Sequence, residues 1–162
     1  MPIVIVRHAH AGSRSAWVGD DQERPLSAKG VAQAEGLVPW LTSQVQPTRL
    51  LSSPYLRCLE TLGPLRRATG LDVEPRPVLG EGQGAEAVAL VGRLPGFVRA
   101  QGPAAVLCTH GDVAVDLFAA FGTAASPDIR STLQKGGLWV LAEVDGTLAI
   151  TGYRPPPVAV PE

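Results

Sequence analysis

Short apolar runs alternate with longer amphipathic segments along most of this chain of 162 residues. Residues 3–6 and 104–109 are nearly unbroken apolar runs. Runs of this kind are typical of strands that are buried on both faces of a parallel sheet. Residues 49–52 and 72–75 predict two further strands, the second of them at an edge of the sheet.

Helices are predicted between these strands, because apolar residues recur there at helical spacing. The first helix follows Ser27, its expected N-cap, to about residue 42, and its predicted buried stripe is Val31, Ala34, Leu37, Val38 and Leu41. We expect Pro39 to kink its last turn. The second helix has Pro54 in its first turn and stops at Gly70, and Pro64 is expected to kink or shorten it.

Two more helices follow the edge strand. A glycine-rich loop at 80–84 precedes a helix predicted at 85–100, which we expect Pro95-Gly96 to interrupt. The last predicted helix covers residues 112–121 and directly follows the second apolar run.

The chain is predicted to close with a β-hairpin. Its strands are residues 137–144 and 148–153, and Asp145-Gly146 between them is typical of a type I′ turn. The proline-rich tail at 155–162 is expected to be extended and poorly ordered. The pattern therefore predicts an α/β protein, a three-layer α/β/α sandwich with a mainly parallel sheet and a C-terminal antiparallel hairpin. We expect one domain over residues 1–154.

Composition and charge narrow the functional classes. An apolar content of 45% suits a globular core, and a net charge of −1 provides no basic field for nucleic acid. No stretch approaches the roughly 20 apolar residues of a membrane span, and the apolar opening is too short for a signal peptide. We therefore expect a cytoplasmic protein without nucleic-acid or membrane partners. Cys58 and Cys108 lack metal or redox spacing and are expected to be small core residues in a reducing compartment.

Candidate chemistry lies where two predicted strands end. Arg7-His8-Ala9 ends the first apolar run, and Thr109-His110-Gly111 ends the second. Carboxyl ends of parallel strands are where open α/β sheets place ligands. Arginine presents a planar fork of donors that suits phosphate oxygens, and Arg57 adds a second such group to Arg7. Two imidazoles with two arginines indicate a phosphate site in which a histidine acts as a nucleophile.

The order of these motifs resembles a known family. The motifs are Arg7-His8-Ala9, the Arg-Pro-Leu-Ser at 24–27, Ser52-Ser53-Pro54 through Arg57 and Glu60-Thr61, and Thr109-His110-Gly111. They resemble the histidine phosphatase superfamily (phosphoglycerate mutase-like) in its short SixA-like branch. The chain is also similar to the histidine-phosphatase domain at the C-terminus of certain bacterial Nudix hydrolases. That similarity rests on Ala11-Gly12-Ser13, Gly19-Asp20-Asp21, the Ala-Gln-Ala-Glu at 32–35, and Lys135-Gly136 through Trp139-Val140-Leu141.

The resemblance implies a mechanism with named catalytic residues. His8 attacks phosphorus and forms a phosphohistidine, while Arg7, Arg57 and His110 surround the phosphoryl oxygens. Glu81 is the proton donor by analogy, and a solvated loop carboxylate is an equally good interpretation of it. Cations of the protein replace Mg²⁺, so no metal or other cofactor is expected.

Several loop residues keep two interpretations. Arg14 and Ser13 are candidates for substrate binding, with solvated loop residues as the alternative. Arg24 either lines the pocket or caps the following helix. Trp17 could stack on a base, but a cover for the core is the commoner role of such a residue. His10 is expected to be an ordinary loop histidine.

The substrate is expected to be a protein phosphohistidine, as the SixA-like resemblance implies, with a nucleotide or another small phosphorylated metabolite as the alternative. Ala9 stands where the larger family usually has glycine, and a methyl group there is tolerable if φ stays negative. The chain lacks the long helical insertions of phosphoglycerate mutases, which disfavours mutase activity. A non-catalytic module that recognises phosphate remains the alternative of another class. A response-regulator-like domain would need an aspartate at a strand end, and none of the predicted parallel strands has one.

Overall fold

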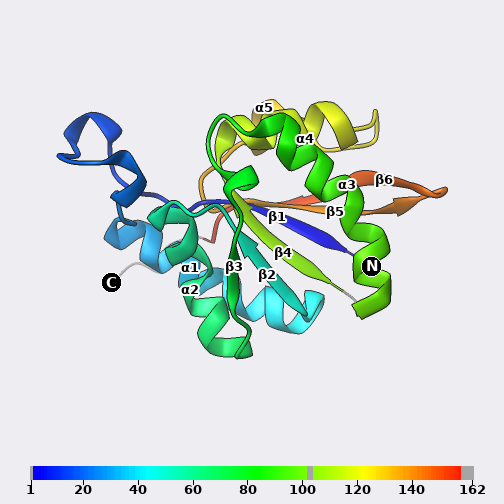
Figure 1. Ribbon diagram of the computed structural model, residues 1–162, viewed down its shortest axis with the longest axis horizontal. Helices are drawn as coiled ribbons and strands as arrows, with labels where there is room; N and C mark the ends of the chain where they lie inside the picture. The colour runs from blue at the N-terminus through cyan, green and yellow to red at the C-terminus, as the bar shows by residue number, and fades with distance from the viewer. Residues whose placement is uncertain (1, 102–103, 158–162) are drawn as a thin grey trace.

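A six-stranded sheet forms the centre of the molecule (Figure 1). The computed structural model describes residues 2–101 and 104–157, and in these its strand order is β3-β2-β4-β1-β5-β6. The strands are β1 (Ile3–Arg7), β2 (Arg49–Ser52), β3 (Val73–Pro75), β4 (Ala105–Thr109), β5 (Leu138–Val144) and β6 (Thr147–Arg154). Strands β1 to β4 run parallel to one another, whereas β5 is antiparallel to both β1 and β6. The predicted sheet is confirmed, with β3 at the edge.

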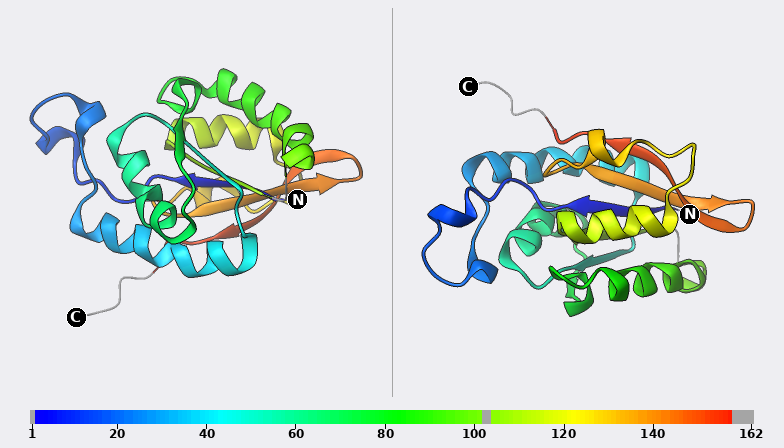
Figure 2. Two further views of the ribbon diagram at one scale, coloured as in Figure 1. Left: turned by 60° about the horizontal axis from the view of Figure 1, so that its bottom comes forward. Right: turned by 90° about the horizontal axis from the view of Figure 1, so that it is seen from above.

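Helices cover both faces of this sheet, as Figure 2 shows. They are α1 (Ala28–Trp40), α2 (Leu56–Thr69), α3 (Gly84–Gln101), α4 (Gly111–Phe121) and the short α5 (Ile129–Thr132). Helices α1 and α2 pack together on one face, and α3 and α4 pack together on the other. Short helical turns are η1 (Arg14–Ala16), η2 (Asp21–Glu23), η3 (Leu41–Val45) and η4 (Pro77–Leu79). The predicted three-layer α/β/α sandwich is therefore confirmed.

Strand β1 contributes side chains to both cores. Ile3 and Ile5 pack with residues of α3 and α4, while Val4 and Val6 pack with residues of α1 and α2. Alternate side chains of a strand point to opposite faces, so a strand covered on both sides has to be apolar throughout. This packing fixes where β1 ends and hence where the residues after it lie.

Prolines disturb the helices less than the sequence predicts. Helix α2 starts at Leu56, after an N-cap at Tyr55, so Pro54 lies outside it rather than in its first turn. The helix continues through Pro64, whose side chain is buried, and the prediction that Pro64 shortens it is wrong. Likewise, α3 is continuous past Pro95. An internal proline removes one backbone hydrogen bond, and in α2 the buried face that packs on the sheet offsets that loss.

Helix α1 begins where predicted and buries a slightly different stripe. The Ser27 hydroxyl accepts a hydrogen bond from the Gly30 N–H, which confirms the predicted N-cap. Val31, however, is 47% exposed, so its predicted burial is wrong. A Cβ on Gly30 would lie 1.9 Å from the His10 carbonyl oxygen. The first turn of α1 therefore packs against the backbone of His10 at a position where only glycine fits. After Trp40 the chain makes a π-helical turn, which ends at Gln46.

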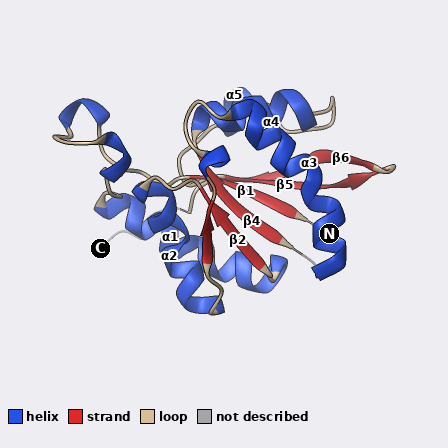
Figure 3. Ribbon diagram, in the orientation of Figure 1, coloured by secondary structure: helices blue, strands red, loops and turns tan. Residues whose placement is uncertain are grey.

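The C-terminal hairpin has the predicted turn. Asp145 and Gly146 both have positive φ, 51° and 80°, as a type I′ turn requires. The hairpin extends beyond the other strands in Figure 3. Of the predicted tail, residues 155–157 are described, and a Cβ on Gly36 of α1 would lie only 2.6 Å from the Cβ of Pro157. Pro157 thus lies against α1, and the rest of the tail, residues 158–162, falls outside the described residues.

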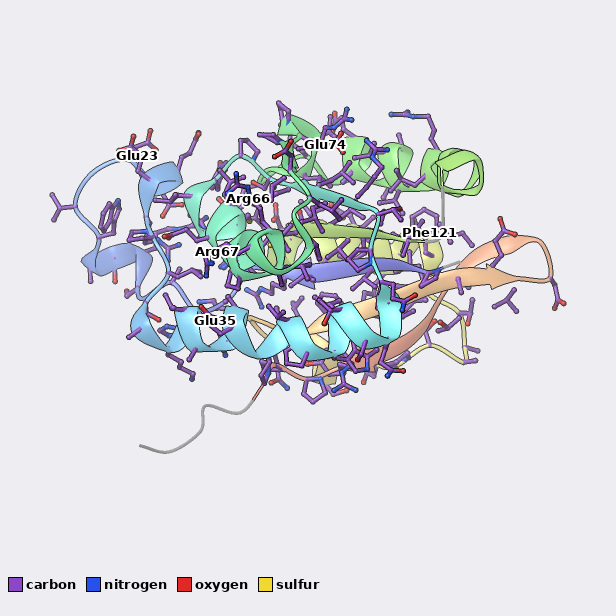
Figure 4. All side chains as sticks on the ribbon, turned by 90° about the horizontal axis from the view of Figure 1, so that it is seen from below. Glu23, Glu35, Arg66, Arg67, Glu74 and Phe121 are labelled. Carbon is purple, nitrogen blue, oxygen red and sulfur yellow. The ribbon has the colours of Figure 1, made fainter. Side chains whose placement is uncertain are left out.

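The outer face of α1 and α2 carries charged side chains, some of which are labelled in Figure 4. Arg67 of α2 reaches Glu35 of α1 at 3.2 Å, with both side chains more than half exposed. An exposed ion pair of this kind contributes little to stability. Within the described ranges, no helix is long and apolar enough to cross a membrane.

Candidate active site

Backbone pairing of β1 with β4 brings His8 beside His110. Arg7 and Thr109 are register partners in this pairing, and the His8 N–H donates to the Thr109 carbonyl at 3.0 Å. The two imidazole centroids lie 5.4 Å apart with their planes at 65°. The expectation that both histidines meet at one edge of the sheet is therefore confirmed.

The His8 ring is held in one tautomer. Its Nδ1 lies 2.8 Å from the carbonyl oxygen of Ala9, and because a carbonyl only accepts, the proton is on Nδ1. In the neutral ring Nε2 then carries the lone pair. Burial lowers the pKa of His8 to about 3; the Ala9 carbonyl opposes this effect, and the nearby His110, Arg57 and Arg7 add to it. The imidazole is therefore uncharged at neutral pH.

His110 is held from the opposite side of its ring. Its Nε2 lies 2.8 Å from the hydroxyl of Ser53 and 3.6 Å from the sulfur of Cys58. The Tyr55 ring packs against it edge-on at 4.6 Å. Its Nδ1 is buried without a hydrogen-bond partner and lies 3.7 Å from Glu81 Oε1.

Arg57 comes from the first turn of α2 and is fully buried. Its guanidinium donates to the backbone carbonyl of Asp21 at 2.8 Å, to the Asp21 carboxylate at 3.1 Å and to Glu81 at 2.9 Å. The Thr61 hydroxyl donates to the Arg57 carbonyl and accepts from the Ala9 N–H. The helix that carries Arg57 is thereby fastened to the residue after His8.

Arg7 lies on the other side of the site, against the N-terminus of α4. Its Nη1 donates to the Leu133 carbonyl at 3.1 Å. A Cβ on Gly111 would lie 2.8 Å from the guanidinium carbon, so the glycine leaves room for this side chain. The N-terminus of α4 therefore permits the close approach that puts Arg7 in the site.

Three buried nitrogens of this site lack hydrogen-bond partners. Across the described residues there are five such buried side-chain atoms, and Arg7 Nε, Arg57 Nε and His110 Nδ1 are three of them. A buried donor without a partner costs roughly 1–3 kcal/mol, so native proteins seldom leave several together. Beside His8, the two guanidinium nitrogens, and His110 Nδ1 in the tautomer that carries its proton there, match what a bound phosphoryl group would accept.

Glu81 lines the cavity of the site, and its side chain is partly exposed. Its Oε1 accepts from Arg57 and also forms an ion pair with Arg14. The loop that carries it is tied down on both sides, since Thr109 donates to the Leu79 carbonyl and the Gly82 N–H donates to Asp112. Glu81 and His8 line the same cavity, and the role of Glu81 as proton donor stays a prediction.

The loop between β1 and α1 stands out from the body in Figures 1 and 2, and Asp21 holds its base. Burial opposes ionisation of Asp21, but the hydrogen bond from Arg24 and the charges of Arg57 and Arg14 lower its pKa. Arg24 is itself buried and donates to the Ala11 carbonyl. It lines the pocket, whereas the helix cap is Ser27.

Other loop residues lie farther from the nucleophile. Ser13 hydrogen-bonds Ser15 and lines a neighbouring hollow, so it is not brought to the wall that carries His8. Trp17 is 37% exposed beside the same hollow and does not cover the core. His10 hydrogen-bonds Ser27 and supports the start of α1, in keeping with a loop histidine.

The site opens into a cavity of about 660 Å³. Its walls include Arg7, His8, Arg14, Arg24, Glu81, Gly111, Asp112 and Lys135. Sequence reasoning did not assign Lys135 or Asp112 to the site. The Lys135-Gly136 pair is among the motifs that carry the family resemblance, and this was the one indication in the sequence that Lys135 belongs to the site. In the parts of the chain that the structure describes, no group of three or more His, Cys, Asp or Glu side chains is arranged to hold a metal ion.

Comparisons with known proteins agree with this arrangement. The model of the histidine phosphatase superfamily (branch 1) matches residues 3–88. The 8-oxo-(d)GTP phosphatase of Mycolicibacterium smegmatis is 35% identical over 157 residues, covering 96% of this chain and 48% of that protein. The chain thus spans about half the length of that curated relative.

Solved structures share the fold. The protein histidine phosphatase SixA complexed with tungstate superimposes with a TM-score of 0.78 at 22% identity, covering 96% of this chain and 97% of the other. A phosphoglycerate mutase from Bacillus anthracis gives a TM-score of 0.72 at 14% identity, covering 92% and 90%. The expected phosphoglycerate mutase-like fold is confirmed.

Proposed function

The chain belongs to the histidine phosphatase superfamily (branch 1), and from this premise we propose that it is a phosphohydrolase acting through a phosphohistidine on His8. The observation that carries the proposal is the set of three unpartnered donors around an uncharged, tautomerically fixed His8. A module that only bound phosphate would have no need of a free nucleophile. The geometry therefore favours catalysis over recognition.

In the first step, the lone pair of His8 Nε2 attacks phosphorus in line with the bond to the leaving group. That bond breaks, and its electron pair goes to the leaving atom, which takes a proton from the Glu81 carboxyl group. Arg7 and Arg57 donate to the equatorial phosphoryl oxygens, where charge is spread in the transition state. The Ala9 carbonyl keeps the proton on Nδ1, so the attacking nitrogen stays the same.

In the second step, water attacks the phosphohistidine. Glu81 takes a proton from the water, the P–N bond breaks, and the electron pair returns to His8 Nε2. His110 takes part in both steps if its Nδ1 carries a proton. In that tautomer the Ser53 hydroxyl donates to His110 Nε2, and the Nδ1–H faces the site.

Two substrate classes fit this chemistry, and we place nucleotides first. The relative named as an 8-oxo-(d)GTP phosphatase is 35% identical to this chain over 157 residues. The SixA structure is 22% identical and supports the fold alone. The cavity is also larger than one phosphoryl group needs. Protein phosphohistidine remains the second candidate because a phosphoramidate would react by the same two steps.

A turnover experiment in EDTA tests the proposal. Wild type and His8→Ala are compared on para-nitrophenyl phosphate, a nucleoside diphosphate and a phosphohistidine protein, with trapping of an acid-labile, base-stable phosphoenzyme. We expect His8→Ala to lose activity on the order of 1000-fold or more, together with the adduct. Absence of both turnover and adduct on all three substrates would contradict the proposal and favour the phosphate-binding module.

A further inference from the structure

Lys135 lines the same cavity as His8. It lies on the turn that precedes β5, and the next residue, Gly136, donates its N–H to the carbonyl oxygens of Arg7 and His8 at 3.0 and 3.2 Å. The Arg7 N–H returns a bond to the Gly137 carbonyl. Gly136 has a φ of +83°, which glycine adopts without strain. The turn is therefore fixed against the end of β1, and Lys135 lines the cavity from there.

The surroundings of Lys135 contain an excess of positive charge. Burial lowers its pKa, and so do the charges of Arg7, Arg24, Arg57 and Arg14. Two acids line the same cavity: Glu81 pairs with Arg14 and Arg57, and Asp112 accepts from the Gly82 N–H. Among the described side chains, none forms an ion pair with the Lys135 ammonium. A half-buried ammonium amid guanidinium groups is stabilised when an anion binds beside it.

Phosphoryl transfer at His8 leaves this ammonium unused. Arg7, Arg57 and His110 offer the unpartnered donors around the reacting phosphoryl group, and Lys135 adds charge on the cavity wall beyond them. A phosphomonoester or a phosphohistidine carries no second phosphate to meet that charge. A phosphoanhydride does, because the leaving group is itself a phosphate.

We propose that Lys135 binds the second phosphate of a phosphoanhydride substrate, such as a nucleoside diphosphate, whose terminal phosphoryl group is transferred to His8. This inference rests on the proposed function and names the substrate class of the same site. In the first step the P–O bond of the anhydride breaks, and the electron pair stays on the departing phosphate. The Lys135 ammonium stabilises the negative charge that develops there.

Kinetic selectivity provides the first test. Lys135→Gln and Lys135→Arg are compared with Lys29→Gln, a change at the exposed lysine of α1, which does not line the cavity. The measured quantity is kcat/KM for GDP divided by kcat/KM for para-nitrophenyl phosphate. A charge-assisted hydrogen bond is worth about 1.5–3 kcal/mol, so Lys135→Gln should lower this ratio at least about tenfold. Lys135→Arg should restore most of it, and Lys29→Gln should leave it unchanged.

A protection experiment gives a readout that needs no turnover. Lys29 and Lys135 are the two lysines of the sequence, so acetylation of each is measured separately by mass spectrometry. Methylene diphosphonate should slow acetylation of Lys135 more than orthophosphate does, with Lys29 as the internal reference. Equal protection by both anions, together with an unchanged kinetic ratio, would overturn the role of Lys135. The proposed function would still stand if the phosphoenzyme on His8 forms, so the two failures are distinguishable.

Discussion

The hydroxyl oxygen of Ser53 lies 2.8 Å from Nε2 of His110, and both side chains are buried. Ser53 follows β2 and His110 follows β4, two parallel neighbours whose pairing sets this distance. The contact leaves only Nδ1 of His110 to face the site. Ser53 is therefore a positioning residue for His110, and its oxygen also accepts from the Tyr55 N–H.

We expect Ser53→Ala to lower kcat on the order of 10- to 100-fold with a small change in KM, because His110 loses its fixed orientation. Steady-state kinetics give both constants, and the melting temperature reports the fold. Because a purely structural role would lower stability and leave the kcat of the folded enzyme intact, that combination would refute this assignment.

Replacing Gly111 by alanine should displace Arg7, since the new Cβ would lie 2.8 Å from the guanidinium carbon. We expect the affinity for orthovanadate or inorganic phosphate to fall about tenfold or more, as one charged donor is lost. Gly92→Ala in α3 is the matched control, because its Cβ meets only the Phe121 ring at 4.0 Å. Isothermal titration compares the two, and equal affinities would show that Arg7 does not depend on Gly111.

Acid should destabilise the protein through His8. Its folded-state pKa is about 3, below the value near 6.5 expected in the unfolded chain. Between these values the unfolded state binds a proton that the folded state does not, so stability falls as pH drops from about 6.5 towards 3. We expect His8→Gln to lose less stability than wild type between pH 7 and pH 4, measured by urea unfolding. Identical losses in both proteins would contradict the lowered pKa.

Glu81→Gln should separate substrates by their leaving groups. Alkyl phosphates need a proton on the departing oxygen, whereas the phosphate released from an anhydride is a better leaving group. We expect turnover of a simple alkyl phosphate to fall about 100-fold, and that of GDP less than about tenfold. The comparison uses kcat for each substrate with wild type and variant. Equal losses on every substrate would mean that Glu81 acts by holding Arg57 and Arg14 in place instead.

Sequence patterns predicted the strands and the ends of strands well. The apolar runs that end at His8 and His110 have to be buried on both faces, and that requirement is local to each strand. The Asp145-Gly146 turn and the Ser27 cap were predicted for the same reason, because each depends on a few consecutive residues. Arg57 was a candidate because its guanidinium suits phosphate oxygens, and the family resemblance added Glu81; the structure brings the two to within 2.9 Å of each other.

Predictions went wrong where one residue's behaviour depends on a distant neighbour. Pro64 stays inside α2, whose buried face packs on the sheet, and Val31 is exposed while its neighbour Gly30 makes the close contact with His10. Neither outcome is visible in the spacing of apolar residues along the helix. Propensity and periodicity are overridden whenever tertiary packing contributes more free energy than the local preference.

The sequence by itself determined the α/β class, the two histidine-bearing strand ends and membership in the family, because short-range patterns and motifs express them. Only the tertiary structure decided that Asp21 holds Arg57, that Ser53 orients His110 and that Lys135 lines the cavity of His8 without an ion-pair partner among the described residues. Asp21 and Arg57 are separated by 36 positions in the chain, and Ser53 and His110 by 57. Lys135 is placed by a turn whose Gly136 N–H donates to the end of β1. Such contacts are set by sheet register and helix packing, which no local stretch of sequence contains.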